Sequence, residues 1–122
     1  QHQRVRRQRQ MCIRDRGCEK KNIIAVIGPC IAQKSYNVKE DFKRKFLKKD
    51  KRNKVFFKKR KNLIYFDLSK YVKLQLKLMK ITNLETINID TFPKKNNFLS
   101  ARRSLHLNHD DYGRNISLIM IN

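Results

Sequence analysis

The chain has 122 residues, enough for at most one domain with a modest hydrophobic core. Lysine and arginine total 31 against 10 acidic residues, a formal net charge of +21. One explanation of this charge is a nucleic-acid or anionic-membrane partner. The other is a compositional bias toward lysine that is spread over all solvated faces. We favour the compositional bias. After residue 16 the basic residues are mostly lysine, whereas bidentate binding of phosphate is typical of arginine. The three cysteines show no paired spacing, which predicts a reduced, cytoplasmic protein. No apolar run approaches the ~20 residues of a membrane helix, so we expect a soluble protein with no membrane partner.

Residues 1–16 differ in composition from the rest of the chain. They hold six arginines and no lysine, and they show no periodicity that would bury one face. A basic nucleic-acid-binding arm is one interpretation. The stretch QRQMCIRDR also resembles translated adapter sequence joined to a truncated reading frame. We therefore treat residues 1–16 as a non-native or disordered leader and residues 17–122 as the folded part.

The first predicted strand is Ile23–Ile27, a run of five apolar residues. Gly28 tolerates backbone angles that side chains forbid and Pro29 fixes its own φ, so a tight turn should present Cys30. Cys30 could be a nucleophile, but no histidine is near it in sequence. A small buried residue in the turn is the favoured role. Ser35, Tyr36 and Gly28 could shape a pocket rim or simply pack in the turn and core, and both interpretations remain open.

The next segment predicts a helix followed by a basic connector. Asn37 and Glu40 fit a capping box at the start of a helix over about Val38–Leu47. The connector Lys48–Asn62 is interrupted by Val55–Phe57. Its aromatic rings could stack on single-stranded nucleic acid or form a short strand or hydrophobic anchor. We favour the anchor, because adjacent phenylalanines do not share one face.

A strand, a helix and a second strand are predicted in the middle of the chain. Leu63–Phe66 is an apolar strand candidate, and Asp67 is placed to cap a helix over about Leu68–Lys80. The apolar residues from Leu84 to Ile89 then indicate a strand. This alternation predicts an α/β fold with a mixed sheet.

The two adjacent arginines are the best candidates for binding an anion. Residues 91–97 form a turn, and Phe98–Ser104 follows it. If that stretch is extended, Arg102 and Arg103 point to opposite faces and only one enters a site. A guanidinium suits a phosphate bidentately. The alternative is structural ion pairs with Asp110 or Asp111, the common fate of arginine near acids.

The last segment contains a possible metal cluster and a predicted strand. HLNHDD, within the loop His106–Tyr112, resembles a set of metal ligands. Two histidines three residues apart converge only on a helix, so we predict no metal ligands here. Gly113 leads into a predicted terminal strand, Ile116–Ile121.

Four short motifs carry a family resemblance. They are IGPCI with Tyr36-Asn37-Val38, then Phe66-Asp67-Leu68, then Thr91 with FLSARR at 98–103, and finally Gly113-Arg114 before the apolar run. In this order they resemble the C-terminal half of the YfiH family. Those proteins were named laccase-domain or multicopper polyphenol oxidoreductases and are now regarded as purine nucleoside phosphorylases.

The resemblance implies that residues 17–122 are the C-terminal half of a layered αββα domain. It implies phosphorolysis of purine nucleosides such as adenosine and inosine, and the family is also linked to adenosine deaminase and polyphenol oxidase activity. The family's zinc or copper ligands (His, Cys and His) belong to the upstream half, so Cys30 is not that cysteine. We therefore expect this chain to bind no metal and to be inactive alone.

The resemblance also places candidate residues for binding substrate or phosphate, without identifying a catalytic residue. These are Arg102, Arg103, Ser100, Gly28, Cys30 and Tyr36. Ala101 replaces the tyrosine of the family's SYRR segment. The alternative function is a small basic RNA-binding module built on Lys43–Lys61, whose binding would fall steeply with salt.

Overall fold

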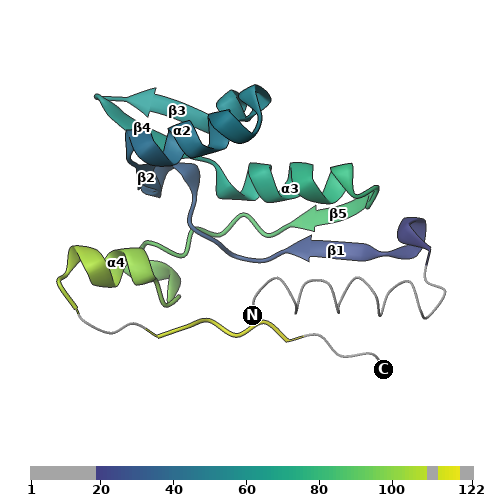
Figure 1. The fold of residues 1–122 in the computed structure, drawn as a ribbon. Helices are drawn as coiled ribbons and strands as arrows, with labels where there is room; N and C mark the ends of the chain where they lie inside the picture. The colour runs from purple at the N-terminus through teal and green to yellow at the C-terminus, as the bar shows by residue number, and fades with distance from the viewer. Residues whose placement is uncertain (1–18, 110–112, 119–122) are drawn as a thin grey trace, which may run out of the picture.

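The computed structural model describes residues 19–109 and 113–118 (Figure 1). The predicted leader, Asp110 and Asp111, and the end of the predicted terminal strand lie outside these ranges. The described elements are η1 (Lys20–Asn22), β1 (Ile24–Ile27), η2 (Gln33–Ser35), β2 (Asn37–Val38), α2 (Glu40–Lys49), η3 (Lys51–Phe56), β3 (Phe57–Arg60), β4 (Leu63–Phe66), α3 (Leu68–Leu78), β5 (Asn83–Thr86), η4 (Lys94–Asn96) and α4 (Ala101–His106). The predicted α/β class is confirmed as a mixed α/β fold, but its strands form two small sheets instead of one mixed sheet.

The first sheet is the parallel pair β1–β5. Its register runs from Ile24 opposite Asn83 to Ile27 opposite Thr86. A parallel pair needs a long crossover, and here the crossover contains the whole second sheet together with α2 and α3. Helix α3 lies along one side of the pair (Figure 1). The predicted strand Ile23–Ile27 is therefore confirmed to within one residue.

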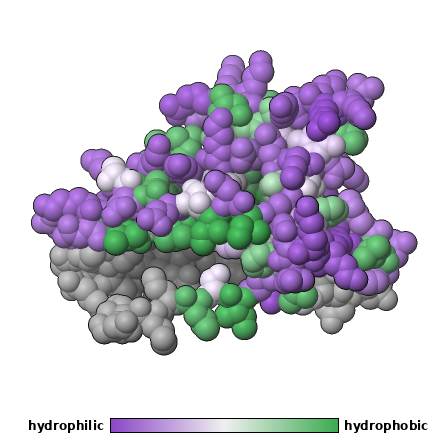
Figure 2. Space-filling view, turned by 180° about the vertical axis from the view of Figure 1, so that it is seen from behind, coloured by the Kyte–Doolittle hydropathy of each residue, from purple (hydrophilic) through white to green (hydrophobic). Residues whose placement is uncertain are grey.

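One face of this parallel sheet stays uncovered by the described residues. Successive side chains of a strand point to opposite faces. Ile27 is buried, whereas Ile24 and Val26 are 66% and 53% exposed. Beyond β5, Ile87 and Ile89 are 43% and 42% exposed. Figure 2 shows hydrophobic surface gathered in a band at the level of these strands.

The second sheet, in the order β2–β4–β3, is antiparallel and carries the core. Phe56 and Phe66 are 2% and 1% exposed. The ring centroid of Phe66 lies 5.3 Å from that of Phe42 and 4.9 Å from that of Phe46, both on α2. Phe56 packs edge-on against Tyr71 of α3 at 5.4 Å. Aromatic packing thus joins both helices to this sheet, and Phe56 and Phe57 form the favoured hydrophobic anchor, whereas Val55 is 63% exposed.

Helix α2 begins later than the capping box predicts. Asn37 and Val38 form β2, which pairs with Tyr65 and Ile64 of β4, and the helix starts at Glu40. Its N-cap, Lys39, makes no side-chain capping bond, so the predicted capping box is wrong. Backbone pairing with β4 satisfies the polar groups of this segment instead, and β-branched Val38 suits a strand.

Helix α3 agrees closely with its prediction. The Asp67 carboxylate accepts a hydrogen bond from the backbone N–H of Lys70 at 3.0 Å, which confirms the predicted N-cap. The helix ends at Leu78, and Lys80 follows with a left-handed backbone, φ 64°. Along the described parts of the chain, no helix has the length and apolar character needed to cross a membrane.

The C-terminal region differs most from its prediction. Residues 101–106 form helix α4, capped by Ser100, so Arg102 and Arg103 do not lie on an extended segment, the case considered from the sequence. Residues 113–118 form no strand, and Ile116 and Leu118 are 82% and 89% exposed. A strand needs a paired neighbour, and residues 113–118 appear in no described sheet. This segment is instead attached through Asn115, whose side chain hydrogen-bonds the backbone N and O of Leu99 at 2.9 and 2.7 Å.

Candidate functional site

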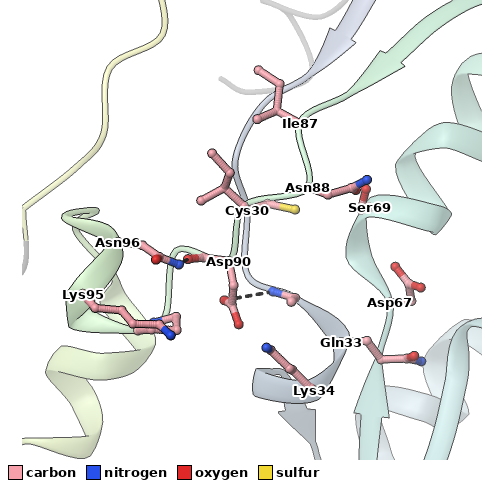
Figure 3. A pocket seen from close by; sticks show the side chains of 13 residues that line it. Cys30, Gln33, Lys34, Asp67, Ser69, Ile87, Asn88, Asp90, Lys95 and Asn96 are labelled. Carbon is pink, nitrogen blue, oxygen red and sulfur yellow. Dashed lines mark hydrogen bonds between the residues drawn. The ribbon is translucent and has the colours of Figure 1, made fainter.

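A pocket of about 550 Å³ with mixed polar and apolar walls lies beyond the carboxyl ends of β1 and β5 (Figure 3). Its walls come from the loop after β1, from η2, from the start of α3, from the segment after β5 and from η4. Open α/β sheets characteristically bind ligands outside the carboxyl ends of their parallel strands. The parallel pair therefore places this pocket where a ligand site is expected.

The Asp90 side chain fastens the two loops that form the pocket. One carboxylate oxygen accepts hydrogen bonds from the backbone N–H groups of Ala32 at 3.1 Å and Phe92 at 3.0 Å. The other accepts from the Ser35 hydroxyl at 2.6 Å. The Cys30 carbonyl also accepts a hydrogen bond from the N–H of Thr91 at 3.2 Å. The loop after β1 is thereby held against the segment after β5.

Asp90 remains ionised to unusually low pH. Burial, the largest single effect, raises the pKa of its carboxyl, but the hydrogen bonds from Ser35, Phe92 and Ala32 and the charge of Lys34 together outweigh it. The net result is a pKa below the ordinary value for aspartate. All three donors stabilise the charged form. At neutral pH the site is therefore built around a buried, fully hydrogen-bonded carboxylate.

The remaining polar groups of the pocket carry both signs of charge. Lys34 and Lys95 line it, and neither forms an ion pair with another described residue. Asp67 contributes a carboxylate at the start of α3, and Asn88 and Ser69 lie on the same side of the pocket (Figure 3). Ammonium groups attract anions, and carboxylate and amide oxygens accept hydrogen bonds from hydroxyls. The pocket can thus hold a ligand that has both an anionic group and hydroxyl groups.

Cys30 lines this pocket as a neutral thiol. Burial, followed by the negative charges of Asp67 and Asp90, raises its pKa. A thiol is nucleophilic only as the thiolate, so these surroundings oppose nucleophilic catalysis at neutral pH. This agrees with the favoured interpretation of Cys30 as a turn residue.

Arg103 holds the loop before α4 in place. Its guanidinium donates to the carbonyl oxygens of Thr91 at 3.4 Å, Phe92 at 2.7 Å and Phe98 at 2.7 Å. These carbonyls use both of its terminal nitrogens. The predicted ion pairs with Asp110 or Asp111 concern residues outside the described ranges and stay a prediction. Within those ranges, the Arg103 guanidinium hydrogen-bonds only to backbone carbonyl oxygens.

Arg102 points to a different cavity. One terminal nitrogen donates to the Asn37 carbonyl at 3.2 Å, and the guanidinium carbon lies 5.2 Å from the centre of the Tyr36 ring. A cation over an aromatic face is attracted by its quadrupole. Arg102 and Tyr36 both line a second pocket of about 640 Å³. Because they follow each other on a helix, Arg102 and Arg103 point in different directions, as they would on a strand.

The six predicted site residues are thus divided among several places. Cys30 lines the first pocket, Tyr36 and Arg102 line the second, and Ser100 and Arg103 stabilise α4 and its preceding loop. Gly28 lines neither pocket. Its φ is not left-handed and an added Cβ would meet nothing within 4 Å, so the predicted conformational reason for this glycine is wrong.

Sequence reasoning missed three prominent residues of the first pocket, namely Asp90, Lys34 and Lys95. A usable signal existed. Polar residues that directly follow a strand lie at the carboxyl edge of a parallel sheet, and Asp90 directly follows the predicted strand Leu84–Ile89, which overlaps β5. The predicted mixed sheet did not specify which strands would be parallel, so the position of Asp90 at a carboxyl edge could not be inferred.

The described residues do not fit a metal centre. No group of three or more histidine, cysteine, aspartate or glutamate side chains among residues 19–109 and 113–118 could hold an ion. His106 ends α4, with its ring 5.6 Å from that of Phe92. The HLNHDD cluster includes acids outside these ranges, so that prediction stays untested.

Comparison with known proteins identifies the family. Residues 3–122 match the model of the multi-copper polyphenol oxidoreductase laccase family. The chain is 43% identical over 98 residues to a Rickettsia conorii protein named purine nucleoside phosphorylase, and 39% identical over 89 residues to a protein of that name from Rickettsia prowazekii. The matches cover 79% and 71% of this chain but only 40% and 37% of the relatives. The predicted resemblance is confirmed, and the chain belongs to the multi-copper polyphenol oxidoreductase laccase (YfiH-like) family.

Proposed function

We propose that this chain is part of a domain that cleaves purine nucleosides by phosphorolysis. The observation that carries the proposal is the pocket beyond β1 and β5, which combines two ammonium groups that form no salt bridge among the described residues with carboxylate and amide oxygens. A nucleoside and phosphate together need that combination, because ribose offers hydroxyl donors and phosphate carries negative charge. The names of the two Rickettsia relatives support the same substrates.

In the proposed reaction a phosphate oxygen attacks the anomeric carbon of the ribose. The new C–O bond replaces the glycosidic C–N bond, and the purine leaves with the bonding electrons and is protonated. Lys34 and Lys95 would hold and orient the phosphate, whose charge shifts toward the sugar in the transition state. Asp67 would accept hydrogen bonds from ribose hydroxyls. Asp90 positions Lys34 through its bonds to the loop that carries it.

The proposal includes the wider domain of which the chain would be the C-terminal half. The chain spans about 40% of the length of the relatives it matches. We infer that the remainder completes a layered αββα domain and covers the apolar face formed by Ile24, Val26, Ile87 and Ile89. The described residues do not fit the metal that the family name implies, so no step of the mechanism uses it. Metal ligands, and with them full activity, would belong to the other half.

Arg102 supplies the second candidate for phosphate binding. Only one of its nitrogens has a hydrogen-bond acceptor within the described residues, and it lies in the second pocket beside Tyr36. Arg103 has fewer free donors, because both of its terminal nitrogens already donate to carbonyl oxygens. If the family motif binds phosphate directly, Arg102 is therefore the residue that does so.

The experiment uses this chain extended at its N-terminus with the corresponding part of the Rickettsia conorii relative. Adenosine and inosine are supplied with and without phosphate, and free purine and ribose 1-phosphate are quantified. We expect purine release to require phosphate, and Lys34→Gln and Lys95→Gln to raise KM for phosphate about tenfold each. Lys59→Gln, an exposed substitution that lines no described pocket, is the control. Equal purine release without phosphate would indicate hydrolysis and refute the proposal.

A further inference from the structure

We propose a second anion site, on the face of the antiparallel sheet opposite α2, that binds the phosphate group of a small ligand. A cavity of about 100 Å³ lies there, lined by Gln33, Lys34, Lys58, Arg60 and Tyr65. Three of these five residues are cationic and none is acidic. The site is a different cavity from the nucleoside pocket proposed above, although Gln33 and Lys34 border both.

The strand register brings these side chains together. Lys58 and Arg60 are two residues apart on β3 and so point to the same face, and Lys58 lies directly opposite Tyr65 of β4. The alternate residues Phe57 and Phe66 point the other way, into the aromatic core under α2. The cationic face is therefore the one that α2 leaves uncovered.

A different segment of the chain supplies the third cation. Helix η2 packs against β4 and carries Gln33 and Lys34, and the Gln33 amide donates to the Phe56 carbonyl at 3.2 Å. That hydrogen bond fixes the position of η2 over the sheet. Lysines on an edge strand such as β3 commonly serve only to prevent pairing with another sheet. Convergence with Lys34 and a tyrosine from two other elements goes beyond that role.

No salt bridge among the described residues involves any of these three cations, although the charge of Lys34 also acts on Asp90. The ion pairs found within residues 19–109 and 113–118 join Glu19 to Lys21 and Asp50 to Arg52. Like charges on neighbouring positions of one face repel each other. A bound anion would remove that repulsion and accept hydrogen bonds from all three side chains.

The size of the cavity selects the ligand. At about 100 Å³ the cavity is much smaller than the pocket of about 550 Å³ beyond β1 and β5, and it suits a single tetrahedral oxyanion better than a nucleoside. A guanidinium binds such a group with two parallel hydrogen bonds, and lysines add point charges. Binding along a nucleic-acid backbone requires a groove with successive sites, whereas this is one small cavity. The ligand is therefore inorganic phosphate or the terminal phosphate of a small molecule.

The test is calorimetric titration of the 122-residue chain with inorganic phosphate and tripolyphosphate at constant ionic strength. The double variant Lys58→Gln/Arg60→Gln should weaken saturable binding at least tenfold. Lys45→Gln/Lys49→Gln removes the same charge from exposed positions of α2 and should change affinity less than twofold. Circular dichroism verifies that both variants keep the fold.

Two results would overturn the site. Equal weakening in both double variants would show attraction by net charge alone, and an absence of saturable binding would show no site. Tighter binding of a single-stranded RNA than of tripolyphosphate, lost in the same variant, would overturn the assignment to a small ligand. None of these outcomes depends on phosphorolysis, because the substituted residues line only the smaller cavity.

Discussion

Removing the Asp90 carboxylate should be among the most destabilising polar substitutions in this chain. Asp90→Ala leaves the backbone N–H groups of Ala32 and Phe92 without their acceptor, and the Ser35 hydroxyl loses a bond of 2.6 Å. Each buried donor left unsatisfied costs about 1–3 kcal/mol, so we expect a loss of about 2–5 kcal/mol in the free energy of unfolding. Asp90→Asn keeps the shape and one acceptor oxygen, and it should cost about 1–2 kcal/mol.

The acid sensitivity of folding supplies an independent measure of the same interaction. The folded-state pKa of Asp90 is lower than that of the unfolded chain, so the unfolded state binds the proton more tightly. The stabilisation is therefore complete well above the ordinary aspartate pKa of ~3.9 and is lost as the pH falls through the folded-state value. Asp90→Asn should remove this part of the acid dependence.

Urea unfolding followed by circular dichroism is the suitable assay, because the chain contains no tryptophan. Titrations between pH 3 and pH 7 compare the wild type with both Asp90 variants. Asp41→Asn, at an exposed acid of α2, is the matched control and should change stability by less than ~0.5 kcal/mol. Two results would refute the structural role assigned to this carboxylate. One is a decrease in the free energy of unfolding below about 0.5 kcal/mol for Asp90→Ala, and the other is a loss of stability at low pH in Asp90→Asn equal to that of the wild type.

Three further substitutions or modifications test other parts of the structure. Phe66→Ala should lower the free energy of unfolding by about 3–5 kcal/mol in the same assay, because this side chain is 1% exposed among aromatic rings. Leu78→Ala, at a side chain that is 64% exposed, should lower it by less than ~0.5 kcal/mol. Similar losses in the two variants would contradict the assigned core. Lys80→Gly should stabilise the chain by about 0.5–1 kcal/mol, since φ of 64° strains a residue with a side chain; destabilisation would contradict the proposed helix end. Alkylation of Cys30, followed by peptide mass spectrometry, should require higher pH than alkylation of a free cysteine because its pKa is raised, and rapid reaction at neutral pH would contradict this.

Local sequence signals predicted the elements whose stability is mostly local. The spacing of apolar residues located α3, and Asp67 marked its start correctly because a capping carboxylate bonds a backbone N–H only three residues away. The apolar run Leu63–Phe66 likewise became β4. The helix and its cap need only neighbours in the chain, and β4 pairs with β3, which directly precedes it in the sequence, so periodicity and capping chemistry suffice.

Elements that depend on distant partners were predicted less well. Asn37–Val38 fitted a helix start, but pairing with β4 made it a strand. Residues 101–106 form a helix that no sequence signal had indicated, with Ser100 as the cap and Arg103 bound to carbonyls of the preceding loop. In both cases contacts from outside the segment outweighed a weak local preference.

The sequence by itself determined the mixed α/β class, the strongest helix and, through its ordered motifs, the family. Only the tertiary structure decided that β1 pairs in parallel with β5, and that pairing creates the pocket. It also joined Asp90 to Ser35, 55 residues earlier in the chain, and gathered Lys34, Lys58 and Arg60 around one cavity. The physical reason is that side chains far apart in sequence meet only after the crossover and both sheets have packed, and no local pattern encodes that geometry.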